Sequence, residues 1–212
     1  MIDKVDDKYY YEENVQYDRV TKILNSYPKP ALYNWYASKG LKECRRIMKE
    51  AREFGTQVHK FIHANLNGDL QASQPKQDEV RMLCTMQEFM KWKNKHSPEP
   101  KRLEYSVINK VDMYGGTIDF VGNIDGVMSI ADWKSSKDIY DDYPLQLAAY
   151  LRAYKLMHPD ENIEEGRIVV FRCDEEGNCK TKSATYSAVQ LDKLFQVFLG
   201  VKRIHDYKYG MK

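Results

Sequence analysis

Two short apolar runs, separated by turn residues, stand near the middle of the chain. They cover residues 116–123 and 127–134, and the segment Asn123–Gly126 joins them. Apolar runs of this length that are bounded by Asn, Asp and Gly are typical of strands connected by a turn. The pattern therefore predicts a β-hairpin at residues 116–134.

Hydrophobic periodicity predicts helices before this hairpin, and a second hairpin between helices after it. The expected helices cover residues 21–25, 31–67 with interruptions near Gly40 and Gly55, 77–96, 144–157 and 187–207. In the third helix, one stripe contains Val80, Leu83, Cys84, Gln87, Met90 and Lys91. Further strands are expected at residues 103–109, 167–173 and 179–186.

Length and composition are those of a compact soluble enzyme. A chain of 212 residues can bury a core, and 42% hydrophobic with 30% charged residues is ordinary for a globular protein. We expect a single domain over residues 1–212, mostly helical over about 1–100, with the catalytic sheet core and a C-terminal helix over about 101–212. The sequence has no long apolar run and no apolar leader, so we expect a cytoplasmic protein without a membrane span.

The four cysteines, Cys44, Cys84, Cys173 and Cys179, form no C-x-x-C pair. Cys173 and Cys179 flank the turn of the second predicted hairpin and could face each other across two strands. Their spacing fits no common zinc or iron–sulfur pattern. Without a secretory signal, we expect reduced thiols.

Charged residues interrupt the first hairpin at Asp119, Asp132 and Lys134. The hairpin could bring the two aspartates to neighbouring positions, and residues two apart on a strand point to the same face, which joins Asp132 to Lys134. Burying these charges without a partner is expensive. A bound divalent cation with oxygen ligands would explain the group.

Two histidines, His59 and His63, lie four residues apart in the second predicted helix and so share a face. A zinc protease would need a glutamate directly after the first histidine, but Lys60 stands there. We expect His63 to be structural, and only the acidic residues elsewhere make His59 a candidate ligand.

Taken together and in order, five short motifs resemble the RecB-like exonuclease branch of the PD-(D/E)XK nuclease superfamily. The motifs are Gly55-Thr56-x-x-His59, Glu104, Gly116-x-x-Asp119, Asp132-x-Lys134 and Gln146-x-x-x-Tyr150. Each is weak alone, but all five stand in the family's order on the expected element types. The resemblance implies a mixed α/β fold: a restriction-endonuclease-like core, with a mixed β-sheet flanked by helices and a helical N-terminal region.

The resemblance also implies roles for these residues. Asp119 and Asp132 would ligate Mg²⁺ or Mn²⁺, together with His59 and the backbone carbonyl of Trp133, and one nitrogen ligand tilts the preference toward Mn²⁺. Lys134 would orient the attacking water and steady the developing negative charge. Glu104 would be a further catalytic acid that holds a second metal or its water, although an exposed strand carboxylate is an open alternative.

DNA contacts are expected from two places. Gln146 and Tyr150 stand one helical turn apart, and the resemblance places both near the cleft, although helix packing also explains Tyr150. The net charge is only +2, so positive charge toward DNA must be local. Basic residues recur in the second helix, where a solvated face with interleaved acids is the alternative: Lys42, Arg45, Arg46, Lys49 and Arg52, with Glu43, Glu50 and Glu53.

These features predict a metal-dependent DNA nuclease, an exonuclease rather than an endonuclease, in DNA replication, recombination or repair. Its expected cofactor is Mg²⁺ or Mn²⁺. Its expected partners are single-stranded DNA or duplex ends, with a recombination or single-strand-binding protein beside them. The alternative is a catalytically inactive or complex-dependent DNA-binding module of the same fold. The presence of Asp119, Asp132 and Lys134 favours the enzyme.

Overall fold

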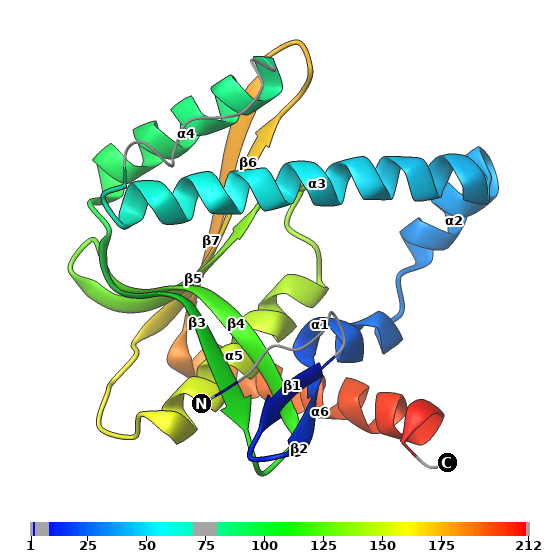
Figure 1. The fold of residues 1–212 in the computed structure, drawn as a ribbon, viewed down its shortest axis with the longest axis vertical. Helices are drawn as coiled ribbons and strands as arrows, with labels where there is room; N and C mark the ends of the chain where they lie inside the picture. The colour runs from blue at the N-terminus through cyan, green and yellow to red at the C-terminus, as the bar shows by residue number, and fades with distance from the viewer. Residues whose placement is uncertain (1, 3–8, 70–79, 211–212) are drawn as a thin grey trace.

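A mixed β-sheet with helices on both faces forms the protein in the computed structural model, which describes residues 2, 9–69 and 80–210 (Figure 1). The strands are β1 (Tyr9–Glu12), β2 (Val15–Arg19), β3 (Glu99–Asn109), β4 (Tyr114–Ile124), β5 (Val127–Lys134), β6 (Glu165–Cys173) and β7 (Cys179–Ser187). The helices are α1 (Val20–Ile23), the 3₁₀ turn η1 (Leu24–Ser26), α2 (Pro30–Lys39), α3 (Leu41–Leu66), α4 (Val80–His96), α5 (Asp142–Met157) and α6 (Ala188–Tyr209). This arrangement confirms the expected mixed α/β fold with a restriction-endonuclease-like core.

The two faces of the sheet bury separate hydrophobic cores. Helices α5 and α6 cover one face, where Leu147 and Phe198 pack against Ile168 and other strand residues. Helices α3 and α4 cover the opposite face, where Phe89 and Trp92 pack with Trp133. Burial of this much apolar surface is the main stabilisation of such a layered fold.

Strand β4 is the branching point of the sheet. One of its edges pairs with β3 in antiparallel orientation. The other edge pairs with β2 at Tyr114 and Gly115, and with β5 from Phe120 to Ile124. Residues 116–119 lie between these two ladders, so the sheet divides at this point.

The pleat of β4 also changes at Asp119. Strict alternation would place Ile118 and Phe120 on one face. Instead, Ile118 belongs to the core under α5 and α6, whereas Phe120 belongs to the core under α3 and α4. The change lets side chains from this short stretch reach both helical layers.

The predicted hairpin is confirmed as β4 and β5. Its turn residues Asp125 and Gly126 have φ angles of 55° and 81°. Positive φ at both central residues is the requirement of a tight hairpin turn, and Asp-Gly meets it at low cost. The ladder ends with the pair Phe120–Ala131, and Asp119 and Asp132 follow directly after it.

The N-terminal part also contains a hairpin that the sequence pattern did not predict. Strands β1 and β2 form an antiparallel hairpin, and β2 continues into a parallel pairing with β4 through Asp18 and Arg19. The prediction missed both strands because only Tyr10 and Tyr17 of the hairpin are buried, which leaves a weak apolar pattern.

Helix α3 runs without a break through Gly55, which corrects the predicted interruption there; the interruption at Gly40 is confirmed, with φ of 79°. A Cβ atom at position 55 would lie 3.3 Å from the hydroxyl oxygen of Ser135. Gly55 therefore lets the helix approach the end of β5 closely, and the glycine reflects packing rather than a helix end.

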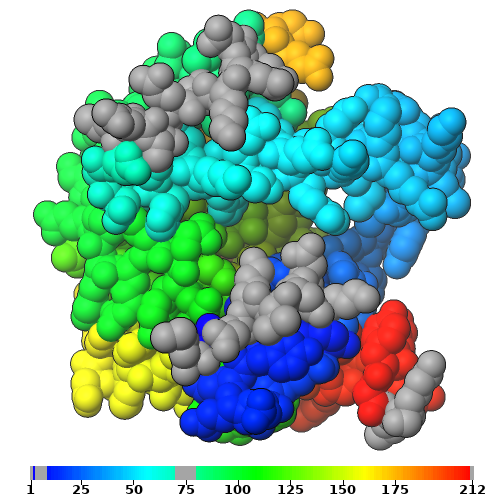
Figure 2. Space-filling model, viewed as in Figure 1, coloured from blue at the N-terminus to red at the C-terminus, as the bar shows by residue number. Residues whose placement is uncertain are grey.

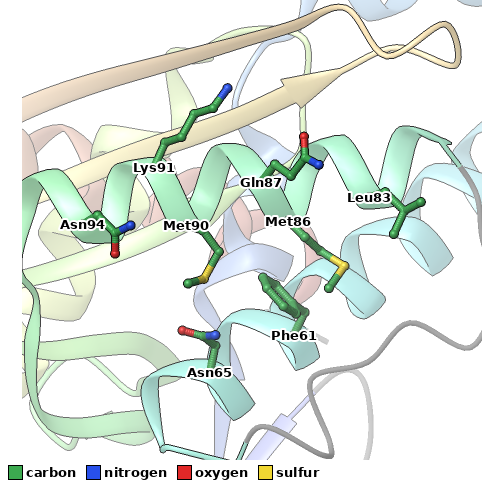
Figure 3. A pocket seen from close by; sticks show the side chains of 8 residues that line it. All are labelled: Phe61, Asn65, Leu83, Met86, Gln87, Met90, Lys91 and Asn94. Carbon is green, nitrogen blue, oxygen red and sulfur yellow. The ribbon is translucent and has the colours of Figure 1, made fainter.

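Helix α4 buries a different face from the predicted stripe. Its buried residues are Met82, Thr85, Phe89 and Trp92, because the aromatic pair fills the core. Part of the predicted stripe instead lines an open groove of about 520 Å³ between α3 and α4 (Figure 3). None of the residues that line this groove is a predicted site residue. The first three positions of the predicted helix, 77–79, lie outside the described residues.

The structure pairs Cys173 with Cys179 as a disulfide at the ends of β6 and β7, with Cα atoms 4.2 Å apart. This differs from the expected reduced thiols, because the two residues are directly opposite in the ladder. Within the described ranges, no helix is both long and apolar enough to cross a membrane.

Candidate active site

Three side chains converge beside the division of the sheet: His59 from α3, Glu104 from β3 and Asp119 from β4. We name them the His–acid triad. Nδ1 of His59 lies 3.5 Å from Oδ1 of Asp119 and 3.9 Å from Oε1 of Glu104. One ligand atom from each of the three residues lies within 4.8 Å of the others. Two carboxylates and an imidazole at this spacing suit a divalent cation.

Glu104 occupies a backbone conformation that is unusual for its residue type. It lies in β3 opposite Asp119, between the pairs Leu103–Phe120 and Tyr105–Ile118, and its φ angle is 48°. A residue with a Cβ atom in the left-handed region costs on the order of 1 kcal/mol, and such strain is concentrated at functional sites. The conformation accompanies a carboxylate aimed at His59 and Asp119.

A second group lies next to the triad, where α5 meets β5; we name Asp132, Lys134, Gln146 and Tyr150 the lysine cluster. Nζ of Lys134 lies 2.7 Å from Oδ2 of Asp132 and donates to Oε1 of Gln146 at 3.2 Å. The amide of Gln146 donates to Oδ1 of Asp132 at 3.2 Å and to the hydroxyl of Tyr150 at 2.9 Å. Gln146 therefore fixes both members of the ion pair.

One hydrogen bond joins the site to the end of the hairpin. The backbone N–H of Trp133 donates to Oδ2 of Asp119 at 2.8 Å. The indole of Trp133 is buried in the core under α3 and α4. The residue therefore contributes its backbone to the site, and its carbonyl as a metal ligand remains a proposal.

Charge coupling shifts the protonation of the triad. Burial disfavours the imidazolium of His59, but the negative charge of Asp119 and the nearby carboxylate of Glu104 outweigh it and raise the pKa of His59 to about 10. Burial also opposes ionisation of Asp119, yet His59 and Lys134 lower its pKa. Without a metal, a proton on His59 compensates the negative charge of the two carboxylates. A bound cation could supply this positive charge instead, so the three ligand atoms fit a cation.

In the lysine cluster, the pKa values of both the acid and the base are raised. Burial and the nearby charge of Asp119 outweigh the attraction of Lys134 and raise the pKa of Asp132 to about 6. Burial also disfavours the ammonium of Lys134, but Asp132 and Asp119 raise its pKa above the ordinary value. Asp119 thus influences both groups, although its ion pair is with His59 and its backbone hydrogen bond is with Trp133.

Gly116 explains how Tyr150 fits against β4. A Cβ atom at position 116 would lie 2.2 Å from Cε1 of Tyr150. The ring is buried, with 4% exposure, so it cannot move into solvent. Glycine at this position is therefore required for the ring that supports Gln146.

We expect Gly116→Ala to lower the free energy of unfolding by about 1–3 kcal/mol, because the added methyl group overpacks a buried ring. Any activity that depends on this site should also fall, since Gln146 loses its support. Gly200→Ala in α6 is the matched control: beyond its own stretch of helix, none of the described residues has an atom within 4 Å of the new Cβ, so stability should hold or rise. Thermal melting and activity of both variants give the measurement. A Gly116→Ala protein that melts and reacts like the wild type would contradict the packing described.

The basic residues of α3 divide between two faces of the helix. With about 100° per residue, Arg52 and Arg45 lie about 20° and 40° from the direction of His59, and Arg46 about 140° away. Arg46 contacts Glu43 and Glu50 at 2.6 Å and 2.7 Å. Lys49 lies 3.8 Å from Glu53. Within the described part of the chain, neither Arg45 nor Arg52 forms an ion pair.

Figure 2 shows the surface hollowed beneath α3, with olive atoms of the β5–α5 region on the floor of the hollow. The face of α3 that carries His59 turns toward the sheet at this place. Sequence reasoning missed one residue here: the ring of Tyr143 lies 4.8 Å from Nζ of Lys134. Its only sequence signal is its position three residues before Gln146.

Comparison with known proteins gives a family match over residues 30–211, to the PD-(D/E)XK nuclease superfamily. The match covers most of the chain and contains both groups of site residues. The chain belongs to the PD-(D/E)XK nuclease superfamily. No protein among those with curated descriptions matches it.

Two solved structures show weaker likeness. A candidate exonuclease from Eubacterium rectale has 14% sequence identity to this chain and a TM-score of 0.44. The matched region covers 75% of this chain and 69% of the exonuclease chain. A protein named SSO0001 has 13% identity and a TM-score of 0.29, covering 68% of this chain and 75% of its own. Membership of the superfamily therefore rests on the family match.

Proposed function

We propose that this superfamily member is a metal-dependent deoxyribonuclease that hydrolyses phosphodiester bonds from a DNA end. The observation that carries the proposal is the position of the His–acid triad directly beside the lysine cluster, with the Trp133–Asp119 hydrogen bond joining the two. The exonuclease mode and a role in recombination, replication or repair are supported by the order of the sequence motifs. A protein partner at DNA ends fits the same role.

The metal ligands in this proposal are His59, Glu104 and Asp119, with Asp132 and the carbonyl of Trp133 joining them. When bound there, Mg²⁺ or Mn²⁺ would supply Lewis acidity and a more acidic water. His59 must lose the proton that it holds in the absence of metal. Metal binding should therefore release a proton and strengthen as the pH rises.

Lys134 would stay protonated after His59 loses its proton, and its ammonium would face the reacting phosphate. Asp132 and Gln146 hold its ammonium in place, so little reorganisation is needed when negative charge develops. Gln146 and Tyr150 are only 8% and 4% exposed. We propose that these two residues position Lys134 and Asp132, in place of the direct DNA contact expected from the sequence.

DNA would approach along the face of α3 that carries His59. Arg45 and Arg52 lie on this face without ion pairs among the described residues and are free to neutralise phosphates. The acid-rich face of the helix, which carries Arg46, lies away from His59. This face fits the alternative of a solvent-exposed charged surface that does not contact DNA. Lys49 lies between the two faces.

The test is digestion of DNA labelled at the 5′ or the 3′ end, in Mg²⁺ and in Mn²⁺. Progressive release of labelled nucleotide from one end would support an exonuclease and give its polarity. Internal cuts would replace the exonuclease mode by an endonuclease. An absence of cleavage with either metal would favour the inactive DNA-binding module. The presence of the complete triad and of Lys134 argues against that alternative.

Reversing Arg45 and Arg52 to glutamate should weaken DNA binding to a similar extent across unrelated sequences. The slope of log K against log salt is negative, and each lost phosphate contact makes it less negative by about 0.7 for single strands, so two should make it less negative by about 1.4. Lys193→Glu with Lys208→Glu on α6 gives the same charge change as a control. Equal salt slopes in the two double variants would place the DNA path elsewhere.

A further inference from the structure

Two tyrosines stand together where the segment after β5 enters α5. The ring centroids of Tyr140 and Tyr143 lie 5.4 Å apart, with the planes at 68°. Tyr143 is half-buried in the first turn of α5, whereas Tyr140 is 48% exposed. An exposed tyrosine is unremarkable by itself, so its position relative to the site decides its meaning.

Tyr143 links the pair to the lysine cluster. Nζ of Lys134 lies 4.8 Å from the centre of the Tyr143 ring, a distance at which the ring attracts a cation. The two distances place the exposed Tyr140 ring within about 10 Å of the Lys134 ammonium. An aromatic ring that can stack on a base and an ammonium that can bind a phosphate thus lie close together. One or two nucleotides can span the distance between them.

The segment that carries Tyr140 is fixed at both ends. Asp138 pairs with Lys182 of β7 at 2.5 Å and accepts the backbone N–H of Ile139 at 2.8 Å. On the other side, Asp142 pairs with Lys29 at 2.7 Å. Little conformational freedom is left to lose when a ligand meets the ring.

We propose that Tyr140 stacks on an unpaired base next to the scissile phosphate, so that the substrate is an unpaired DNA strand or a frayed end. The inference rests on the proposed nuclease function and names its substrate class. In a duplex both faces of an internal base are covered by its neighbours, whereas an unpaired base has a face free for an aromatic ring. Stacking uses the face common to all bases, so sequence preference stays low.

The test compares binding without cleavage, in EDTA, to a single strand with 2-aminopurine at its end and to a blunt duplex of the same sequence. Tyr140→Leu should bind the single strand about ten-fold more weakly and lose the fluorescence quenching of the 2-aminopurine. Tyr140→Phe should retain both, because the ring remains. Duplex affinity should change less than two-fold. Tyr207→Leu, which removes a 75% exposed ring on α6, is the matched control.

Unchanged single-strand affinity and quenching in Tyr140→Leu would overturn the proposal, as would an equal loss for strand and duplex. A Tyr140→Phe protein as defective as Tyr140→Leu would also overturn it, because the hydroxyl rather than the ring would then matter. Failure of the parent proposal looks different: the wild type cleaves neither DNA with Mg²⁺ or Mn²⁺. The binding measurements need no cleavage, so the two failures are distinguishable.

Discussion

Replacing Lys134 by methionine should lower kcat/KM on DNA by at least about 100-fold at pH 7, the scale for losing one preorganised donor to a developing charge. Methionine keeps much of the length and apolar stem of lysine and removes the ammonium that contacts Asp132 and Gln146. Loss of this charge also raises the pKa of Asp132 above its value of about 6, so the carboxyl becomes more protonated at neutral pH.

The matched control for this variant is Lys137→Met, an exposed lysine three residues further along the same segment. Steady-state cleavage of end-labelled DNA and thermal melting should be measured for both. We expect Lys137→Met to react like the wild type. A Lys134→Met protein with wild-type cleavage would remove Lys134 from the reaction and with it the proposed role of the lysine cluster.

The parts of the site that depend on local sequence were predictable. An Asp-Gly turn between two apolar runs gives the β4–β5 hairpin, and a separation of two residues on a strand joins Asp132 to Lys134. The geometry agrees in both cases, with an Asp132–Lys134 distance of 2.7 Å. Short-range rules suffice here because neighbouring residues decide the conformation.

The division of the site into two groups was not predictable from such rules. It depends on the change of pleat at Asp119, which directs this carboxylate toward α3 while Asp132 meets α5. Nothing in the local sequence marks that change, and the β2–β4 pairing beside it also joins segments far apart in the chain. Glu104 in the left-handed region is a second non-local feature, since nothing in its own neighbourhood favours a positive φ.

The two glycines of the site have a related explanation. The sequence pattern predicts a helix interruption near Gly55, but the helix continues and the small residue allows the close approach to Ser135. Gly116 serves the approach of Tyr150 in the same way. Both glycines belong to the motifs that resemble the nuclease family, so packing around the site accounts for motif positions that carry no chemistry themselves.

Replacing Asp119 by asparagine should reduce cleavage by at least about 1,000-fold, because a bound metal contributes several kcal/mol to such reactions. Mn²⁺ affinity, measured by calorimetry, should fall by about 100-fold or more, the upper scale for losing even an outer partner of a metal ligand. Asparagine keeps an oxygen for the Trp133 N–H, which lies 2.8 Å from Oδ2 in the wild type. The loss of function should therefore come with little loss of stability.

Asp119→Ala separates the two roles of this side chain. It removes the charge and also leaves the buried Trp133 N–H without its acceptor, so it should cost a further 1–3 kcal/mol, roughly, in the free energy of unfolding. Asp160→Asn, at an exposed aspartate outside the site, is the control for loss of one carboxylate. If Asp119→Asn bound Mn²⁺ and cleaved DNA like this control, Asp119 would be only a structural acceptor for Trp133. The triad would then not be the metal centre, whatever the activity of the wild type.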